Sequence, residues 1–407
     1  MEVKLGYKQT EVGVIPDDWA VSTLEKICSF ENGDRSSNYP SPGSFRQSGI
    51  PFINAGHVSE GKISTSEMNY ITQEAYERLG GGKIKAGDIL FCLRGSLGKF
   101  GVVNDNFGLG AIASSLVIVR PRAAALSLDY LSLYFSSSIC SQMIDIWAGG
   151  AAQPNLGAKE LARFSIPIPA SLTEQHAIAQ ALSNVDALLD SLESLIAKKR
   201  DLKQAAMQQL LTGQTRLPGF SGEWEVTRLG DVLKFQVGCP FSSAYFNEKQ
   251  QGLRLIKNRD LKSDDQIFYY SGKYDLSFCV SNGDVLIGMD GDFLPCRWNK
   301  GVALLNQRVG RIVTLAGLNR EFALYYLIGP LKEIEMATAS TTVKHLSHGD
   351  IEDIVKPLPS VAEQGAIASA LIEIDAEIAT LEERRLKTAA LKQGMMQELL
   401  TGRTRLV

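Results

Sequence analysis

The sequence has little that would place the protein in a membrane or outside the cell. In its 407 residues, no run approaches the roughly 18 apolar residues that a membrane-spanning helix needs. The opening residues, MEVK, show no basic segment followed by an apolar stretch, which a secretion signal would require. We therefore expect a cytoplasmic protein, and its length predicts two or three domains.

Cysteines are few, and no metal-binding pattern surrounds them. The chain has no Cys-x-x-Cys pair and no histidine at a metal spacing from a cysteine. His345 and His348 could share a helix face, but no carboxylate lies at a matching zinc spacing. We expect buried, reduced thiols and no metal site. The six cysteines are Cys28, Cys92, Cys140, Cys239, Cys279 and Cys296.

Motifs of nucleotide and cofactor chemistry are also missing. Residues 95–99, GSLGK, lack the Gly-x4-Gly-Lys spacing of a phosphate-binding loop. The sequence has no Gly-x-Gly-x-x-Gly turn for an adenosyl cofactor and no Asn-Pro-Pro-aromatic tetrapeptide of a methyltransferase. His57 and His176 have no evident nucleophile partner. We expect no catalytic residue and no cofactor in this chain.

The charge is nearly balanced along the whole chain. The net charge is -3, and it divides as -1, 0, -1 and -1 over residues 1–170, 171–217, 218–360 and 361–407. No region is basic, although phosphate neutralisation dominates most nucleic-acid affinities. Any nucleic-acid contact must therefore come from local clusters of Lys and Arg, or be shared with a more basic partner.

What the sequence does contain is a long internal repeat. Residues 174–217 align with 363–406 without a gap, with 24 identities in 44 positions. Weaker echoes link Asp18-Trp19 with Glu223-Trp224, and the Gly-Asp pairs at 87–88 and 283–284. This pattern predicts two globular domains, each followed by a helical segment. The expected limits are 1–170 and 214–358 for the domains, and 171–213 and 359–407 for the helical segments.

The repeated segments have the pattern of long helices. Apolar residues step by 4 and 3 in both copies, which is the spacing of a coiled-coil seam, and Gly213 and Gly402 stand where a helix would end. We expect the two helices to pack on each other; two separate amphipathic helices, each on its own domain, are the alternative. The seam residues are Ile178, Leu182, Val185, Leu189, Leu192 and Ile196, then Ile367, Leu371, Ile374, Ile378 and Leu381, with Ala181, Leu188, Leu195 and Leu202 widening the first stripe.

The globular regions have the composition of a mixed α+β fold. Short runs typical of strands lie between Gly, Asn and Ser clusters, at 50–53, 88–92, 116–119, 253–256 and 284–287. The loops carry side chains of the kind that read base edges and grip phosphates; simple solvation is the alternative for each. The candidates are Asn54, Arg94, Ser96, Lys99, Gln153 and Asn155 in the first region, and Lys257, Asn258, Arg259, Arg297, Lys300, Gln307, Arg308, Lys344 and His345 in the second.

Three features together resemble a known family. They are residues 7–19 (YKQTEVGVIPDDW), the Glu-Gln-x-Ala-Ile-Ala starts at Glu174 and Glu363, and the two Leu-Leu-Thr-Gly-x-Thr-Arg-Leu ends. In this combination the chain is similar, over essentially its whole length, to the DNA specificity subunit of type I restriction-modification enzymes. The resemblance implies two target recognition domains alternating with two helical regions that pack as an antiparallel coiled coil. Each domain would read one half of a bipartite, asymmetric site in double-stranded DNA.

The same resemblance implies partners for a chain that is itself not an enzyme. Two modification subunits carrying S-adenosylmethionine would methylate adenine, and restriction subunits with motor and nuclease activity, which use ATP and Mg, would complete the complex. Antiparallel packing of duplicated helices would relate the two domains by a pseudo-two-fold axis that matches the dyad of duplex DNA. A DNA-free adaptor with two protein- or ligand-binding lobes is the rival hypothesis, and a stand-alone DNA-modifying enzyme fails on the missing cofactor loop.

Overall fold

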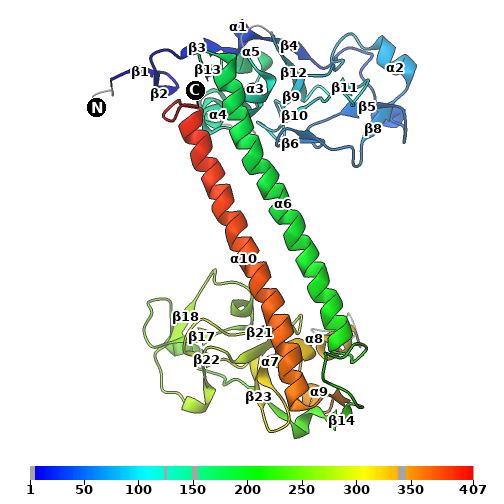
Figure 1. The fold of residues 1–407 in the computed structure, drawn as a ribbon, viewed down its shortest axis with the longest axis vertical. Coiled ribbons are helices and arrows are strands. Elements are labelled where there is room, and N and C mark those ends of the chain that lie inside the picture. The colour runs from blue at the N-terminus through cyan, green and yellow to red at the C-terminus, as the bar shows by residue number, and fades with distance from the viewer. Residues whose placement is uncertain (1–4, 123–125, 149–154, 338–344, 407) are drawn as a thin grey trace. The chain divides into compact units, whose positions relative to one another are not determined.

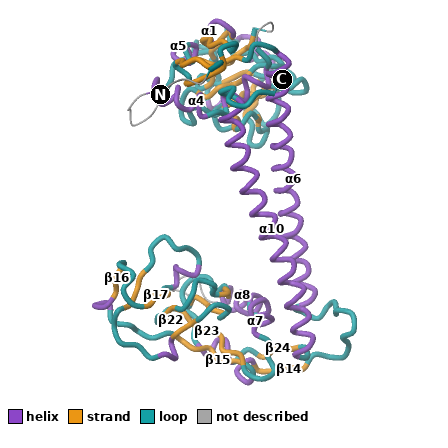
Figure 2. Tube along the Cα trace, turned by 60° about the vertical axis from the view of Figure 1, so that its left-hand side comes forward, coloured by secondary structure: helices purple, strands orange, loops and turns teal. Residues whose placement is uncertain are grey.

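The computed structural model describes residues 5–122, 126–148, 155–337 and 345–406. The chain forms two compact units, unit 1 (Met1–Glu193 with Arg384–Val407) and unit 2 (Ser194–Glu383). Each unit therefore combines one globular region with parts of both long helices, α6 (Leu172–Leu210) and α10 (Val361–Leu399) (Figure 1). The globular parts mix helices and strands, as the sequence predicts (Figure 2).

Unit 1 is built on two small sheets. A four-stranded antiparallel sheet has the order β10-β9-β12-β4 and a three-stranded sheet the order β11-β5-β8. The strands are β1 (Tyr7–Thr10), β2 (Gly13–Pro16), β3 (Ala20–Thr23), β4 (Cys28–Asn32), β5 (Ile50–Ile53), β6 (Val58–Ser59), β7 (Lys62–Ile63), β8 (Asn69–Ile71), β9 (Ile89–Cys92), β10 (Phe100–Val102), β11 (Ala111–Ile112), β12 (Leu116–Pro121) and β13 (Ser165–Ile168). The short helices are α1 (Leu24–Ile27), α2 (Gln73–Arg78), α3 (Leu128–Phe135), α4 (Ser138–Ala148) and α5 (Ala158–Ala162).

Unit 2 repeats this plan. Its four-stranded sheet has the order β15-β23-β20-β21, and a five-stranded sheet has the order β16-β18-β17-β22-β19. The strands are β14 (Glu225–Arg228), β15 (Leu233–Val237), β16 (Phe246–Asn247), β17 (Leu253–Ile256), β18 (Phe268–Tyr270), β19 (Cys279–Val280), β20 (Val285–Gly288), β21 (Pro295–Arg297), β22 (Ala303–Leu305), β23 (Val309–Thr314) and β24 (Val355–Leu358). The helices are α7 (Arg320–Tyr326), α8 (Ile328–Ala337) and α9 (His348–Glu352). All five predicted strand runs are strands, which confirms that part of the prediction.

In each unit the start of one long helix packs into the domain core together with the end of the other. In unit 1, Ile178 and Leu182 of α6 share a buried cluster with Leu399 of α10 and Trp19. In unit 2, the cluster holds Ile367 and Leu371 of α10 with Leu210 of α6. The alternative that each helix packs only on its own domain is therefore wrong, because each unit uses both helices.

Ion pairs show that the two helices run antiparallel within each unit. In unit 1, Asp186 Oδ1 binds Lys392 Nζ at 2.5 Å and Glu193 Oε1 binds Arg385 Nη1 at 3.1 Å. In unit 2, Lys199 binds Glu377 and Lys203 binds Asp375, with Nζ–O distances of 2.5 and 2.6 Å. Numbers rise along α6 as they fall along α10. That the helices form one coiled coil from end to end stays a prediction.

The predicted seam is narrower than the sequence suggests. Seven of its eleven residues are buried, and Val185, Leu189, Ile374 and Leu381 are half-buried. Ala181 is half-buried and packs against the unit 1 core, as predicted, but Leu188, Leu195 and Leu202 are 39, 41 and 58% exposed, so the prediction that these three leucines widen the stripe is wrong. They lie on a face of α6 that the partner helix leaves open.

Candidate nucleic-acid interface

An aspartate, buried in unit 1 and half-buried in unit 2, anchors the candidate loop of each unit. In unit 1, Asp88 precedes β9 and binds Arg120 of the adjacent strand β12, with Nε–Oδ1 2.6 Å and Nη2–Oδ2 2.8 Å. In unit 2, Asp284 precedes β20 and binds Arg311 of β23, with Nη1–Oδ2 3.4 Å. The glycine before each aspartate has a positive φ, 83° and 93°, which favours glycine. The repeated Gly-Asp pair thus fixes the same strand start in both units.

The loop after β9 places Arg94 beside Asn155 in unit 1. The two residues form an antiparallel β-bridge, and Arg94 Nε donates to Asn155 Oδ1 at 3.0 Å. Next to the bridge, the amide of the buried Leu156 donates to the Leu93 carbonyl at 3.1 Å. Both polar side chains are exposed. A buried backbone contact therefore holds this exposed pair, the 94/155 pair, in place.

Unit 2 has the same bridge with different side chains. Asp290 pairs with His345, and the amide of the buried Leu346 donates to the Met289 carbonyl at 2.8 Å. His345 Nδ1 lies 3.0 Å from Asp290 Oδ1. The position of Arg94 is thus taken by a carboxylate, and the position of Asn155 by an imidazole.

A third loop completes the arrangement in unit 2. Arg308, between β22 and β23, has its Nη1 3.3 Å from Asp290 Oδ1 and 3.2 Å from His345 Nδ1. Asn258 also joins, because its Nδ2 donates to the Asp290 carbonyl at 2.7 Å. The structure therefore brings the predicted residues Asn258, Arg308 and His345 together around Asp290, which was not among the candidates. We call Asp290, Arg308 and His345 the 290/308/345 cluster.

The other candidates of unit 1 lie elsewhere. Asn54 closes its own turn, since its Oδ1 accepts from the Gly56 amide at 2.8 Å. Lys99 lines a groove of about 710 Å³ that Asp186 and Lys392 of the long helices also line. Ser96 caps the turn before Lys99, whose amide donates to the Ser96 carbonyl at 3.1 Å. Gln153 lies outside the described residues.

A cluster of cations and aromatic rings lies near β17 and β18 in unit 2. Lys257 Nζ lies 3.2 Å from the centre of the Phe268 ring, and the Arg259 guanidinium lies 5.4 Å from it. Burial lowers the pKa of Lys257 below its usual range. Lys300 Nζ binds Asp264 Oδ1 at 2.8 Å. Carboxylates therefore balance part of the positive charge here.

Arg297 is half-buried and pairs with a carboxylate of its own unit. Its guanidinium pairs with Glu321 of α7, and its Nε is buried without a hydrogen-bond partner in the described part of the chain. This position favours a structural role over a contact with DNA. Gln307 is exposed beside Arg308, and Lys344 lies outside the described residues.

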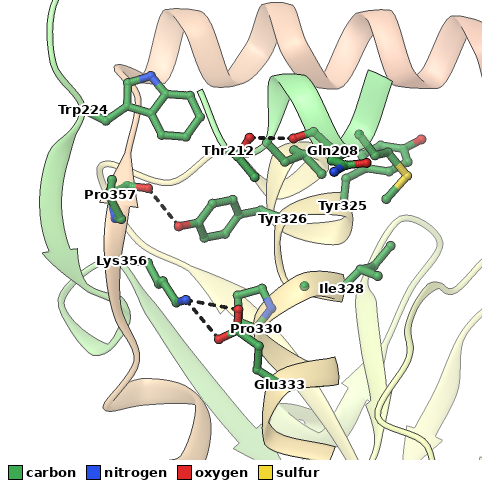
Figure 3. A pocket seen from close by; sticks show the side chains of 13 residues that line it. Gln208, Thr212, Trp224, Tyr325, Tyr326, Ile328, Pro330, Glu333, Lys356 and Pro357 are labelled. Atoms are coloured by element: carbon green, nitrogen blue, oxygen red, sulfur yellow. Dashed lines mark hydrogen bonds and ion pairs between the residues drawn. The ribbon is translucent and has the colours of Figure 1, made fainter. Parts of the chain in front are cut away.

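An apolar pocket of about 380 Å³ lies at the end of α6 in unit 2 (Figure 3). Met207, Leu211, Trp224 and Tyr326 line it, and the Tyr326 hydroxyl donates to the Pro357 carbonyl at 2.8 Å. The equivalent pocket of unit 1, about 330 Å³, is lined mainly by serines 136–138 and 141, Gln393 and Gln397. None of the predicted site residues lines either pocket. The pocket of unit 2 suits an apolar side chain better than a phosphate.

The six cysteines of the two units lie at different depths. All six cysteines are free; burial raises the pKa of Cys28 and Cys140 to about 12 and keeps them as thiols. Cys239, Cys279 and Cys296 are only half-buried, contrary to the prediction. Within the described ranges, no group of three or more metal-ligating side chains is placed to hold an ion. Across the same residues, every helix is too short or too polar to cross a membrane.

Sequence reasoning missed Asp290 as part of the site. Only its alignment with Arg94, through the Gly-Asp echo six residues upstream of each, could have indicated it. The only signal in the sequence is that the Gly-Asp pair stands at the same distance before Arg94 and before Asp290, while the side chain at that position differs. The residues around Asp290 do not indicate its contacts with Arg308 and His345, which come from distant loops.

The chain matches known proteins over most of its length. The family model "Type I restriction modification DNA specificity domain" matches twice, at residues 16–199 and 221–390. The EcoBI specificity subunit of Escherichia coli is 36% identical over 185 residues, which span 44% of this chain and 39% of that protein. The putative MjaX specificity subunit of Methanocaldococcus jannaschii is 26% identical and covers 98% of this chain and 96% of its own length.

Solved structures agree in fold. The type I restriction-modification S subunit from M. genitalium aligns with a TM-score of 0.58 at 16% identity, covering 98% of each chain. The HsdS subunit from Thermoanaerobacter tengcongensis aligns with a TM-score of 0.52 at 19% identity, covering 95% of this chain and 98% of its own. With both halves matched by one family model, the chain belongs to the family of type I restriction-modification DNA specificity subunits.

Proposed function

We propose that each unit of this specificity subunit reads one half of a bipartite, asymmetric site in double-stranded DNA. The observation that carries the proposal is the pair of equivalent β-bridges, Arg94 with Asn155 and Asp290 with His345. The frame is the same in both units and the exposed side chains differ. Two different half-sites require this combination of equal geometry and unequal chemistry.

The long helices serve as the spacer in this proposal. Each has 39 residues and spans about 58 Å at 1.5 Å per residue. Because both helices contribute to both units, their length sets the distance between the half-sites. The two half-sites would therefore be separated by a fixed number of base pairs whose sequence is not read.

The partners are two modification subunits and, in the full complex, restriction subunits. Leu188, Leu195 and Leu202 repeat every seven residues on α6 and stay exposed, and Leu386 and Leu391 of α10 are 63 and 59% exposed. Exposed apolar stripes of this kind suit a docking surface, so the isolated chain should self-associate and gain stability from a modification subunit. The chain itself is non-catalytic and cytoplasmic in this proposal, and S-adenosylmethionine, ATP and Mg belong to the partners.

The experiment is reconstitution with the modification subunit, followed by methylation mapping on genomic DNA. The expected result is adenine methylation at one bipartite motif, lost when this chain is omitted. A complex that forms but methylates without sequence preference would contradict the proposal. It would favour the DNA-free adaptor, which the near-neutral charge and the acidic partners of Lys300 and Arg308 also favour.

A further inference from the structure

The two β-bridges are equivalent in their buried parts. In both units, the leucine after the bridge is buried and donates its amide to the carbonyl of the residue that precedes Arg94 or Asp290. The distances are 3.1 Å for Leu156 and 2.8 Å for Leu346. Each bridge therefore fixes the next exposed side chain relative to the domain core.

Each unit presents one arginine at this place, but from a different loop. Arg94 stands in the bridge itself, whereas in unit 2 the bridge holds Asp290, which binds Arg308 from the turn between β22 and β23. Unit 2 has a carboxylate, Asp290, at the bridge position that Arg94 occupies in unit 1. Its ion pair with Arg308 places an arginine at this position again. The side chain of Arg308 is 54% exposed, and Arg94 is exposed as well.

Among the residues that the structure describes, the hydrogen bonds leave one edge of each guanidinium free. The Nε of Arg94 is engaged by Asn155, which leaves its two terminal nitrogens. The Nη1 of Arg308 is engaged by Asp290 and His345, which leaves its Nε and Nη2 edge. Two adjacent N–H groups are what a guanidinium needs to bind N7 and O6 of guanine, and anchoring of the remaining nitrogen orients that edge in advance.

We propose that Arg94 and Arg308 each read one guanine, Arg94 in the half-site of unit 1 and Arg308 in that of unit 2. Asn155, Asp290 and His345 are positioning residues that orient the guanidinium groups of the two arginines. The inference rests on the proposed function and adds the residues that set specificity. A phosphate contact by either arginine is the competing outcome.

The test uses Arg94→Lys and Arg308→Lys in the complex with the modification subunit. Lysine keeps the charge that a phosphate needs but loses the planar fork that guanine needs. Matched controls are Arg403→Lys in unit 1 and Arg228→Lys in unit 2, two arginines paired with carboxylates and 51 and 47% exposed. Methylation mapping gives the motif, and binding to cognate and scrambled duplexes at two salt concentrations separates base from phosphate contacts.

The expected result is that each variant relaxes one G·C position in one half-site, with preference there falling about tenfold or more. The other half-site, the controls and binding to scrambled DNA should not change. An unchanged motif, or an equal loss on all DNA with a smaller salt dependence, would overturn the inference. If the wild-type complex methylates without a motif, the proposed function fails instead, so the two failures are distinguishable.

Discussion

Arg405 near the C-terminus binds Glu174 at the start of α6, with Nη2–Oε2 2.9 Å, although 231 residues separate them. Glu174 is buried, and its Oε2 also accepts from Trp19 Nε1 at 3.3 Å. Unit 2 has the equivalent pair, Arg216 with Glu363. The repeated Thr-Arg-Leu ends thus close each unit by binding the Glu-Gln start of the other helix.

Removing the arginine should destabilise unit 1 strongly. Arg405→Ala leaves a carboxylate that is 2% exposed without its cation, which costs roughly 3–5 kcal/mol of unfolding free energy. Adding Glu174→Ala should recover part of this loss, because the unpaired charge is gone. Urea unfolding of the wild-type chain, the two single variants and the double variant measures the coupling energy between Arg405 and Glu174. Arg403→Ala, exposed two residues away, is the control, and equal effects of both arginines would contradict the account.

Acid should weaken the same closure through Asp18. The hydrogen bond from Arg405 lowers the pKa of Asp18 below its ordinary value of 3.8, so folding favours the carboxylate. Its contribution is therefore present above the unfolded-state pKa and is lost as the pH falls through the lower folded-state pKa. As the pH falls below about 4, Asp18→Asn should lose less stability than the wild-type chain. Thermal melting against pH measures this, with Asp17→Asn as the exposed neighbour; parallel curves would refute it.

The buried aspartate under the recognition loop should matter more in unit 1 than in unit 2. Asp88 is fully buried, and its hydrogen bonds raise the pKa of Arg120, which stays charged. Asp88→Asn removes the buried anion of that arginine and leaves Glu31, 3.3 Å away and 36% exposed, as its carboxylate partner, so the loss should be roughly 3 kcal/mol, the lower end for a broken buried pair. Asp284→Asn should cost less, since Asp284 is 20% exposed. Comparison of the two unfolding midpoints measures the difference, and the reverse order would be inconsistent with the burial.

The sequence predicts the long helices and the strands well because their signals are local. Heptad steps and a repeat of 44 positions predict α6 and α10 to within about three residues of the stop glycines Gly213 and Gly402, and short apolar runs predict strands such as β9 and β20. The site is different, because its contacts join distant loops. Nothing near Arg94 indicates Asn155, and nothing near Arg297 indicates Glu321, the carboxylate with which its guanidinium pairs.

Shortening the helices should shorten the gap in the DNA site. Glu193 binds Arg385, so residues 189–195 and 383–389 lie opposite each other, and deleting both heptads brings the domains about 10 Å closer. This distance equals about 3 base pairs of duplex DNA. Removing them also rotates one half-site relative to the other by about a quarter turn around the DNA axis, and deformation of the DNA or the protein must compensate for this rotation. We expect weak methylation at a shortened gap, or none.

A length-matched control for this deletion replaces 189–195 with a copy of 182–188 and 383–389 with a copy of 376–382. Methylation mapping compares the two variants. Full activity of the deletion variant at the original gap would show that α6 and α10 do not set the spacing.

The most direct test of the central claim, that each unit reads its own half-site, is an exchange of one recognition region. Residues 221–358 are replaced by the equivalent region of another specificity subunit, and the motif is mapped by methylation in the complex with the modification subunit. The account predicts that one half-site changes while the other half-site and the gap stay the same. A motif that stays unchanged, or one that changes in both halves, would contradict it.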